Sequence, residues 1–354
     1  SMGKTIEKPM GKHLRWISRL ILALILAELI YPVAPAHAAV DTIVVDPKSQ
    51  NADINFGTDS SICTLREAIW AVNHHTSFDG CVADASTNKI ELPAGNYLLT
   101  RGGSGEEASY WGDLDIISDV TITGAGAATT SVSVDPNTAI NDRDRIFDVK
   151  NPVKGQPERI TVTIQGLTIS GGYAQDKGGG GAVLNEDAEV ILRAVIIKSN
   201  EAAKGTSGGG ILNEGLMTID NSVIDSNRAA YFGGGIENHG QMIITNSLVV
   251  GNIANAGGGV DNLPQDRNTG YAEMTNVTVA ANSGGGINNS GKFDAANLTI
   301  ARNDGTGLFL NGVDYDANLR NTIIAYHFPY PDCQLQYQET RFTSGGYNLI
   351  DNTQ

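Results

Sequence analysis

The sequence predicts an all-β protein, a right-handed parallel β-helix with a short capping helix near its N-terminus. The first observation is a recurring phrase, Gly-Gly-Gly-apolar-x-Asn, whose asparagines are spaced by 24 to 28 residues, a period typical of solenoids. The second is that each period holds two or three short runs of strand-forming residues. The third is that no helical segment separates these runs, which excludes leucine-rich and helical repeats. Parallel crossovers are right-handed as a rule, and this sets the predicted hand of the coil.

Two sets of asparagines are predicted to lie at the corners of successive coils. In a parallel stack, equivalent side chains lie about 4.8 Å apart, so their amides can form a hydrogen-bonded ladder. Asparagine also tolerates the left-handed backbone of a tight corner, and the glycine triplets let the chain bend sharply. The first set closes the glycine phrase at Asn213, Asn238, Asn262 and Asn289, after an altered copy that ends at Asn185. The second set precedes short apolar strands at Asn221, Asn246, Asn276, Asn297 and Asn321.

The N-terminal segment has the three-part pattern of a secretory signal peptide. Ser1, which precedes the first Met, is taken as a cloning remnant. Basic residues lead into an apolar run over residues 20–30, and a small-residue cleavage site follows at residues 36–38. We therefore expect residues 1–38 to be removed. The alternative of a membrane anchor is disfavoured because the run is shorter than the ~20 residues that span a bilayer.

The charge of the chain limits its partners. The full sequence has 24 basic and 39 acidic residues, a formal charge of −15, and removing residues 1–38 makes the balance −18. Such a surface repels nucleic acid and anionic lipid. We therefore expect no nucleic-acid partner and, after signal cleavage, no insertion into a membrane.

Residues 39–100 are predicted to form an N-terminal cap, and residues 101–354 the β-helix repeats with a C-terminal cap. Residues 63–73 form the one predicted helix, with a capping box made by Thr64 and Glu67. Its apolar face can close the open end of the stack, which a repeat protein has to cover. At the other end, Phe328, Tyr330 and Tyr337 are predicted to cover the last coil.

Three cysteines remain in the mature chain, and three pairings are open. The closely spaced Cys63 and Cys81 are favoured as a disulfide in an exported protein, which leaves Cys333 as a thiol or a long-range partner. No Cys-x-x-Cys motif or neighbouring histidine array accompanies them, so a metal site at the cysteines is disfavoured.

Several of these motifs resemble bacterial surface proteins. Residues 63–69, Cys-Thr-Leu-Arg-Glu-Ala-Ile, resemble the signature of CSLREA-domain proteins, with Thr in place of Ser, and residues 112–126 resemble the segment that follows it. The glycine phrases resemble the repeats of polymorphic outer-membrane proteins, and residues 321–350 are similar to the choice-of-anchor Q-type region. The resemblance implies an exported β-helix of the pectate-lyase-like superfamily, displayed on the bacterial surface or released. It implies no particular activity. No sorting signal is recognised after Ile350, so we expect a released protein or a piece of a longer one.

Three residues are candidates for ligand binding. Asp113 and Asp115 are two apart on a predicted strand, so they share a face and could hold a cation such as Ca²⁺. A solvated outer face is the favoured interpretation of the pair. His239 belongs to an Asn-His-Gly motif that resembles one of the galacturonan hydrolases. We interpret it as a turn residue, because neither paired aspartates nor an Arg-x-Lys motif accompanies it. No other cofactor is expected.

The function expected from the sequence is that of a secreted or cell-surface protein, adhesin-like or binding matrix or glycan, without an evident catalytic site. Its partner would be an extracellular glycan or another surface protein. The alternative is a polysaccharide lyase or glycoside hydrolase, and the fold by itself does not decide between them. A groove that gathers acidic and basic side chains would favour the alternative.

Overall fold

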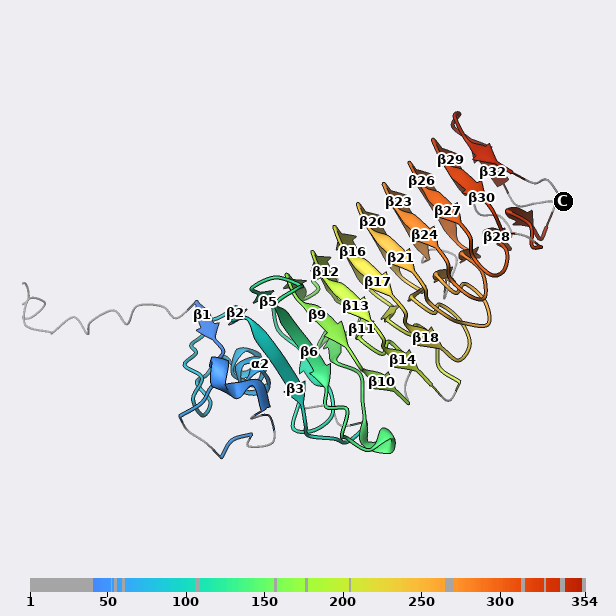
Figure 1. Ribbon diagram of the computed structural model, residues 1–354. Helices are drawn as coiled ribbons and strands as arrows, with labels where there is room; N and C mark the ends of the chain where they lie inside the picture. Colours follow the sequence, from blue (N-terminus) through green and yellow to red (C-terminus); the bar gives the residue numbers. More distant parts are fainter. Residues whose placement is uncertain are drawn as a thin grey trace, which may run out of the picture. The chain divides into compact units, whose positions relative to one another are not determined.

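The computed structural model describes residues 41–351 except 52, 54–55, 59–60, 106–108, 156–157, 176–177, 204, 265–269, 313–315, 328 and 338–340. The predicted signal peptide, residues 1–38, lies outside this part of the chain. The strands of the described part stack one behind another along a single direction (Figure 1). All the strand pairs of the four sheets are parallel. The predicted right-handed parallel β-helix is confirmed. No helix among the described residues is long and apolar enough to cross a membrane.

Four sheets form the faces of the coil. Sheet I contains β1 (Thr42–Val44), β2 (Lys89–Leu92), β5 (Val120–Gly124), β8 (Thr161–Gln165), β12 (Glu189–Arg193), β16 (Leu216–Asp220), β20 (Gln241–Thr245), β23 (Tyr271–Thr275), β26 (Lys292–Ala296), β29 (Asp316–Arg320) and β32 (Arg341–Ser344). Sheet II contains β4 (Leu114–Ile116), β7 (Phe147–Lys150), β11 (Val183–Glu186), β15 (Ile211–Asn213), β19 (Ile236–Asn238), β22 (Val260–Asn262), β25 (Ile287–Asn289), β28 (Leu308–Leu310) and β31 (Cys333–Leu335).

Sheet III contains β3 (Gly95–Leu99), β6 (Thr130–Val134), β9 (Thr168–Ser170), β13 (Ile196–Lys198), β17 (Val223–Asp225), β21 (Leu248–Val250), β24 (Thr278–Ala280), β27 (Thr299–Ala301), β30 (Ile323–Ala325) and β33 (Leu349–Ile350). Sheet IV contains the short strands β10 (Tyr173–Ala174), β14 (Glu201–Ala202) and β18 (Arg228–Ala229). Outside the sheets lie α2 (Leu65–His74) and two 3₁₀ helices, Pro47–Asn51 and Ile140–Asp142.

The core follows from the alternation of side chains along each strand. In β20, Met242 and Ile244 point inward and are fully buried, while Gln241 and Ile243 are exposed. Successive coils repeat this pattern in register, so the inward Val, Ile, Leu and Met side chains form one continuous core.

The first predicted row of asparagines forms a buried ladder. Each Nδ2 donates to the Oδ1 of the next residue, at 2.7 Å from Asn185 to Asn213, from Asn213 to Asn238 and from Asn238 to Asn262, and at 2.6 Å from Asn262 to Asn289. All five side chains are buried. Buried amides are costly unless they are hydrogen-bonded, and the ladder satisfies them by repetition.

The second predicted row lies at exposed corners instead of forming a buried ladder. All five residues have the left-handed backbone expected of a corner, with φ between 49° and 61°. Side-chain bonds between neighbours join Asn276 to Asn246 at 3.0 Å and Asn321 to Asn297 at 2.6 Å. These amides therefore serve as turn residues, and water can satisfy them where no neighbour does.

A second buried ladder is made by asparagines that the prediction did not single out. Four of them lie six residues beyond an exposed corner asparagine, as Asn227 follows Asn221, whereas Asn200 follows Ala194 at that spacing. The Nδ2–Oδ1 bonds between successive members measure 2.9 to 3.0 Å. The members are Asn200, Asn227, Asn252, Asn282 and Asn303, all buried.

This second ladder ends on a histidine. Asn303 Nδ2 lies 3.1 Å from His327 Nε2, which has to accept because an amide nitrogen only donates. The ring proton therefore sits on Nδ1, which donates to Asp332 Oδ1 at 2.5 Å. Both His327 and Asp332 are buried. The histidine thus takes the place of the next asparagine in the ladder.

We predict that His327→Asn is tolerated, whereas His327→Ala lowers the free energy of unfolding by about 1–3 kcal/mol. Asparagine can accept from Asn303 and donate to Asp332. Alanine leaves Asn303 Nδ2 with its bond to Val279 O alone and Asp332 Oδ1 with its bond from the backbone N of residue 327 alone. Urea unfolding of the two variants beside the parent protein measures the difference. Equal stability of the alanine and asparagine variants would show that the ladder does not depend on this terminus.

The helix α2 packs against β2 and β4. Its predicted capping box is present: Glu67 N donates to Thr64 Oγ1 at 3.2 Å, and Thr64 N donates to Glu67 Oε2 at 3.0 Å. Arg66 on the same helix is fully buried, and its Nε donates to Asp53 Oδ1 at 2.6 Å. The structure thus adds a buried ion pair to the apolar contacts expected of the cap.

The structure joins Cys63 and Cys81 in a disulfide, while Cys333 on β31 is half-buried and outside any disulfide. Strands β1, β2 and β3 lie within the segment predicted as a cap, residues 39–100, yet they belong to sheets I and III. The coil therefore begins before residue 101.

Candidate functional site

The residue at position x of the glycine phrase points outward from sheet II. Leu212 pairs in register with Glu237, Glu237 with Asp261, and Asp261 with Asn288. In-register side chains of parallel strands lie about 4.8 Å apart, so charges in this row act on one another directly. We call this line the x row. Its members are Asp115, Asp148, Leu184, Leu212, Glu237, Asp261, Asn288, Phe309 and Gln334.

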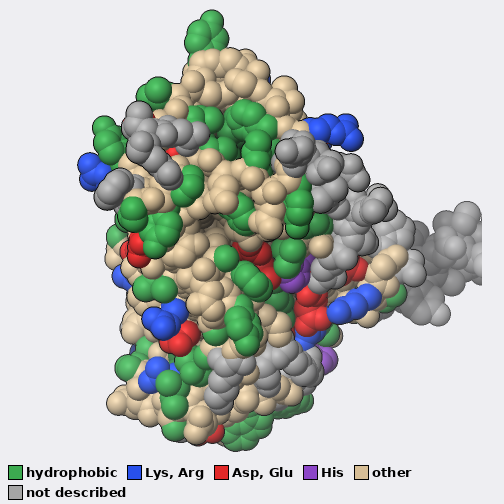
Figure 2. Space-filling model, turned by 90° about the vertical axis from the view of Figure 1, so that its right-hand side faces the viewer, with side chains coloured by type: hydrophobic (Ala, Val, Ile, Leu, Met, Phe, Trp, Pro, Cys, Tyr) green, Lys and Arg blue, Asp and Glu red, His purple; other side chains and the backbone are tan. Residues whose placement is uncertain are grey.

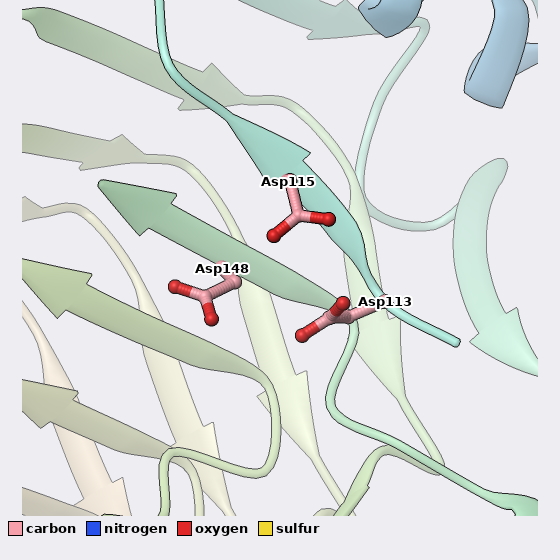
Figure 3. A group of neighbouring side chains, drawn as sticks. All are labelled: Asp113, Asp115 and Asp148. Carbon is pink, nitrogen blue, oxygen red and sulfur yellow. The ribbon is translucent and has the colours of Figure 1, made fainter. Parts of the chain in front are cut away.

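The N-terminal end of the x row carries a cluster of three carboxylates. Asp115 on β4 and Asp148 on β7 are joined by Asp113, which immediately precedes β4, and one oxygen of each lies within 4.8 Å of the others. Figure 3 shows the three carboxylates turned toward a common space. Arg145 Nη1 lies 3.1 Å from Asp113 Oδ2 and 3.0 Å from Asp148 Oδ2. Lys150 Nζ lies 3.1 Å from Asp148 Oδ2. The chain's own cations thus bind this cluster.

The favoured interpretation of Asp113 and Asp115 as a solvated outer face is wrong. Their exposed fractions are 2% and 1%. Both carboxylates are covered, because Ser109 N donates to Asp115 Oδ2 at 2.7 Å and Arg145 folds against Asp113. Burial, followed by the nearby charges of Asp144 and Asp115, raises the pKa of Asp113 well above its usual range.

A divalent cation was the other interpretation of this pair. Carboxylate oxygens are the ligands that Ca²⁺ prefers, and Asp113 Oδ1 and Asp148 Oδ1 are buried without a hydrogen-bond partner. Yet the second oxygens of these two residues are held by Arg145 and Lys150, which supply positive charge where a cation would. The donor set therefore fits an internal ion-pair network better than a calcium cage.

The middle of the x row holds a second charged group, centred on His239. This residue lies between β19 and β20, the turn position expected for it. Its Nε2 is 2.9 Å from Glu237 Oε1 and its Nδ1 is 3.9 Å from Glu214 Oε1. Burial disfavours the imidazolium, but the contacts with Glu214 and Glu237 outweigh it and raise the pKa of His239 to about 9. The ring is therefore cationic at neutral pH.

Asp261 is the next member of the row beyond Glu237. It is 1% exposed, its Oδ1 accepts a hydrogen bond from Asn288 Nδ2, and its Oδ2 has no partner. Burial raises the pKa of Asp261 to about 7, with the charge of Glu237 adding to the effect and the bond from Asn288 opposing it. Glu237 Oε2 is likewise buried without a partner.

A groove opens at the C-terminal end of the x row. Its volume is about 490 Å³, and its floor includes Asn288 and Phe309 of the x row. One wall is backbone from the glycine corners, among them Gly284 and Gly285. Tyr330, predicted to cover the last coil, lines the groove and is 46% exposed, whereas Phe328 lies outside the described residues. We call this feature the x groove.

Polar side chains complete the x groove. Asn255 and Gln334 provide amides, Ser283 and Thr306 provide hydroxyls, and Asp304 provides one carboxylate. Lysine and arginine are absent from the described residues that line it. On the side of the molecule seen in Figure 2, hydrophobic and uncharged atoms dominate, and acidic side chains gather with histidine near the middle of the view. The groove therefore presents aromatic surface with mostly uncharged hydrogen-bonding groups.

The sequence candidates and the structural site overlap only in part. Asp113, Asp115 and His239 all lie on the face of sheet II, but in two separate charged groups, and none lines the x groove. Sequence reasoning missed Glu237, Asp261 and Phe309. The signal was present, because position x of aligned phrases has to form one outward row.

No protein-family model matches the chain, and no curated protein matches it. Among solved structures, the chain is similar to the A-module of mannuronan C-5 epimerase AlgE6 of Azotobacter vinelandii, with 16% identity over 84% of this chain and 87% of that one and a TM-score of 0.49. The A-module of epimerase AlgE4 of the same organism shows 14% identity over 84% and 96% of the two chains, with a TM-score of 0.36. The catalytic domain of a GH87 α-1,3-glucanase shows 12% identity over 89% and 71%, with a TM-score of 0.30.

Proposed function

We propose that the chain is an exported, adhesin-like protein that binds a neutral oligosaccharide in the x groove. The observation that carries this proposal is the pairing of Phe309 and Tyr330 with the amides of Asn255 and Gln334 in one groove. Aromatic rings offer apolar faces on which sugar rings stack, and amides can donate to and accept from hydroxyl groups. The expected ligand is neutral, because the chain is acidic and the described lining has a single carboxylate and no basic side chain.

Export rests on the signal-peptide pattern of residues 1–38 and on the resemblance to CSLREA-domain and choice-of-anchor proteins, which also favours display on a bacterial surface or release. N-terminal sequencing of protein recovered from the medium or the cell surface is expected to begin near Ala39. If no saccharide binds in a glycan screen, the result favours the other expected partner, a second surface protein.

We predict that replacing both Phe309 and Tyr330 with Ala weakens oligosaccharide binding by at least about tenfold, since each aromatic contact contributes about 0.5–1.5 kcal/mol beyond its buried area. A glycan array on residues 39–354 first identifies the ligand, and calorimetric titration then compares the variants. Tyr326→Ala is the matched control, because Tyr326 is 75% exposed and does not line the x groove. Unchanged affinity in the double variant would refute binding in this groove.

One observation favours the alternative of polysaccharide cleavage. Glu237 and Asp261 are in-register carboxylates, and the pKa of Asp261 is raised to about 7, which is the property of a general acid. Their burial, 3% and 1% exposed, keeps a glycosidic oxygen from reaching them. Release of reducing or unsaturated ends from the bound oligosaccharide, abolished by Glu237→Gln, would establish the enzyme instead.

A further inference from the structure

A second hollow lies away from the x groove, where strands β23, β26, β29 and β32 of sheet I end. Two cavities of about 360 and 570 Å³ share Thr275, Ala296, Arg320 and Gly345. Three of these residues stand in one register row, since Thr275 pairs with Ala296 and Ala296 pairs with Arg320. The two cavities therefore form one continuous cleft along the end of the sheet, which we call the end cleft.

Arg320 supplies the cleft with a positive charge. It is exposed, it lines both cavities, and no carboxylate among the described residues lies within ion-pair distance of it. Among the residues that the structure describes, the guanidinium of Arg320 is therefore available for a ligand. A guanidinium presents a planar fork of donors that matches a carboxylate with two parallel hydrogen bonds.

Tyr347 stands at the rim of the same cleft for a structural reason. In the preceding coil, two residues, Asn321 and Thr322, connect β29 to β30. The last coil uses four residues, from Gly345 to Asn348, between β32 and β33. Asn321 N donates to Gly346 O and Leu349 N donates to Thr322 O, so the added length bulges outward at Tyr347.

The exposure of Tyr347 makes its ring available to a ligand. Its φ is +57°, the left-handed backbone that corner residues of other coils also have, and its side chain is 93% exposed. The ring therefore offers a face for stacking within reach of a group held by Arg320.

The other polar groups of the end cleft limit what can bind. Glu273 Oε2 accepts from Tyr271 Oη at 2.9 Å, and Asp294 Oδ1 accepts from Asn318 Nδ2 at 2.6 Å. Asp294 Oδ2 also lies 3.4 Å from Lys292 Nζ, so Glu273 Oε1 is the carboxylate oxygen left to accept a hydroxyl group of a sugar. The charges of Glu273 and Asp294 would repel a polyanion, so the cleft suits one acidic group surrounded by hydroxyls.

We infer that the end cleft binds a sugar residue bearing a single carboxylate, with Arg320 holding the carboxylate and Tyr347 stacking on the ring. This site takes a different ligand class from the x groove and does not depend on it. Because the charge-assisted contact is exposed to solvent, binding is expected to weaken as the salt concentration rises.

The test is a titration of residues 39–354 with glucuronic acid and, separately, with glucose, followed by ligand-observed NMR. The protein is expected to bind glucuronic acid about tenfold more tightly than glucose, and Arg320→Gln is expected to remove that preference. Arg302→Gln, at another exposed arginine, is expected to change nothing. Tyr347→Ala is expected to weaken binding of both sugars, while Tyr326→Ala is not. All four side chains are exposed, so the variants are expected to fold.

Equal affinity for the two sugars, no binding of either, or full binding by Arg320→Gln would overturn the inference. The Phe309 and Tyr330 double variant separates the two sites. Loss of neutral oligosaccharide binding with retained glucuronic acid binding is expected of it, and loss of both would place glucuronic acid in the x groove and refute the end cleft.

Discussion

Replacing Arg145 with Met is expected to lower the free energy of unfolding by about 3–5 kcal/mol, because it leaves Asp113 and Asp148 as buried charges without their shared cation. Arg145 is 4% exposed and contacts both carboxylates within 3.1 Å. Methionine preserves most of the apolar stem, so the loss reports the charge rather than a cavity. Urea unfolding at pH 7 measures it.

The pH dependence of this variant adds a second criterion. Burial raises the pKa values of Asp113 and Asp148 in the folded protein, so their protonation as the pH falls removes the unpaired charge. The gap between variant and parent is therefore expected to narrow in acid. Arg193→Met, on the exposed side of β12, is the control. A loss below about 1 kcal/mol, as for a surface pair, would contradict a buried network. If the methionine variant fails to fold, Arg145→Lys is expected to fold with a smaller loss.

Replacing Asp261 with Asn is expected to stabilise the protein at pH 8 by roughly 2–4 kcal/mol and by a smaller amount, about 1–2 kcal/mol, at pH 5. The folded pKa of Asp261 is about 7 against an ordinary value of 3.8. Between these values the folded protein holds a proton that the unfolded chain has released, so stability falls as the pH rises through this window and stays low above it. Asparagine carries no charge to bury and keeps an acceptor for Asn288.

Chemical unfolding of the parent and the variant at pH 5 and pH 8 tests this effect. His239 faces the same carboxylates and its raised pKa also makes stability fall, between its ordinary value of 6.5 and about 9, so only the difference between variant and parent is informative. Asp142→Asn, in an exposed 3₁₀ helix, is the control. An equal loss of stability at both pH values would mean that Asp261 is ionised in the folded protein and needed as a charge.

The repeat made the fold predictable from the sequence. Asn213 and Asn238 fall one coil apart, and a side chain that must stack on its own copy leaves little freedom in register. The second ladder was harder to predict. Asn227, which belongs to it, and the exposed Asn221 recur with the same period, so the sequence alone does not show which of the two is buried. Only the left-handed corner at Asn221 decides which amide points outward.

The site was predictable only where it follows the period. The row that joins Glu237 to Asp261 follows from aligning position x of the glycine phrase. The burial of Asp115 does not follow from this alignment. The groups that cover Asp115 come from Ser109 and from neighbouring coils, and their positions do not repeat with the period. The glycine corners, expected to shape only the coil, also supply a wall of the x groove through Gly284 and Gly285.

The structure of the protein with the oligosaccharide that binds it tests the central claim most directly. An intact oligosaccharide in the x groove, with a sugar ring against Phe309 or Tyr330 and amide contacts from Asn255 or Gln334, is the predicted result. An empty x groove, or a cleaved product lying beside Glu237 and Asp261, would contradict it.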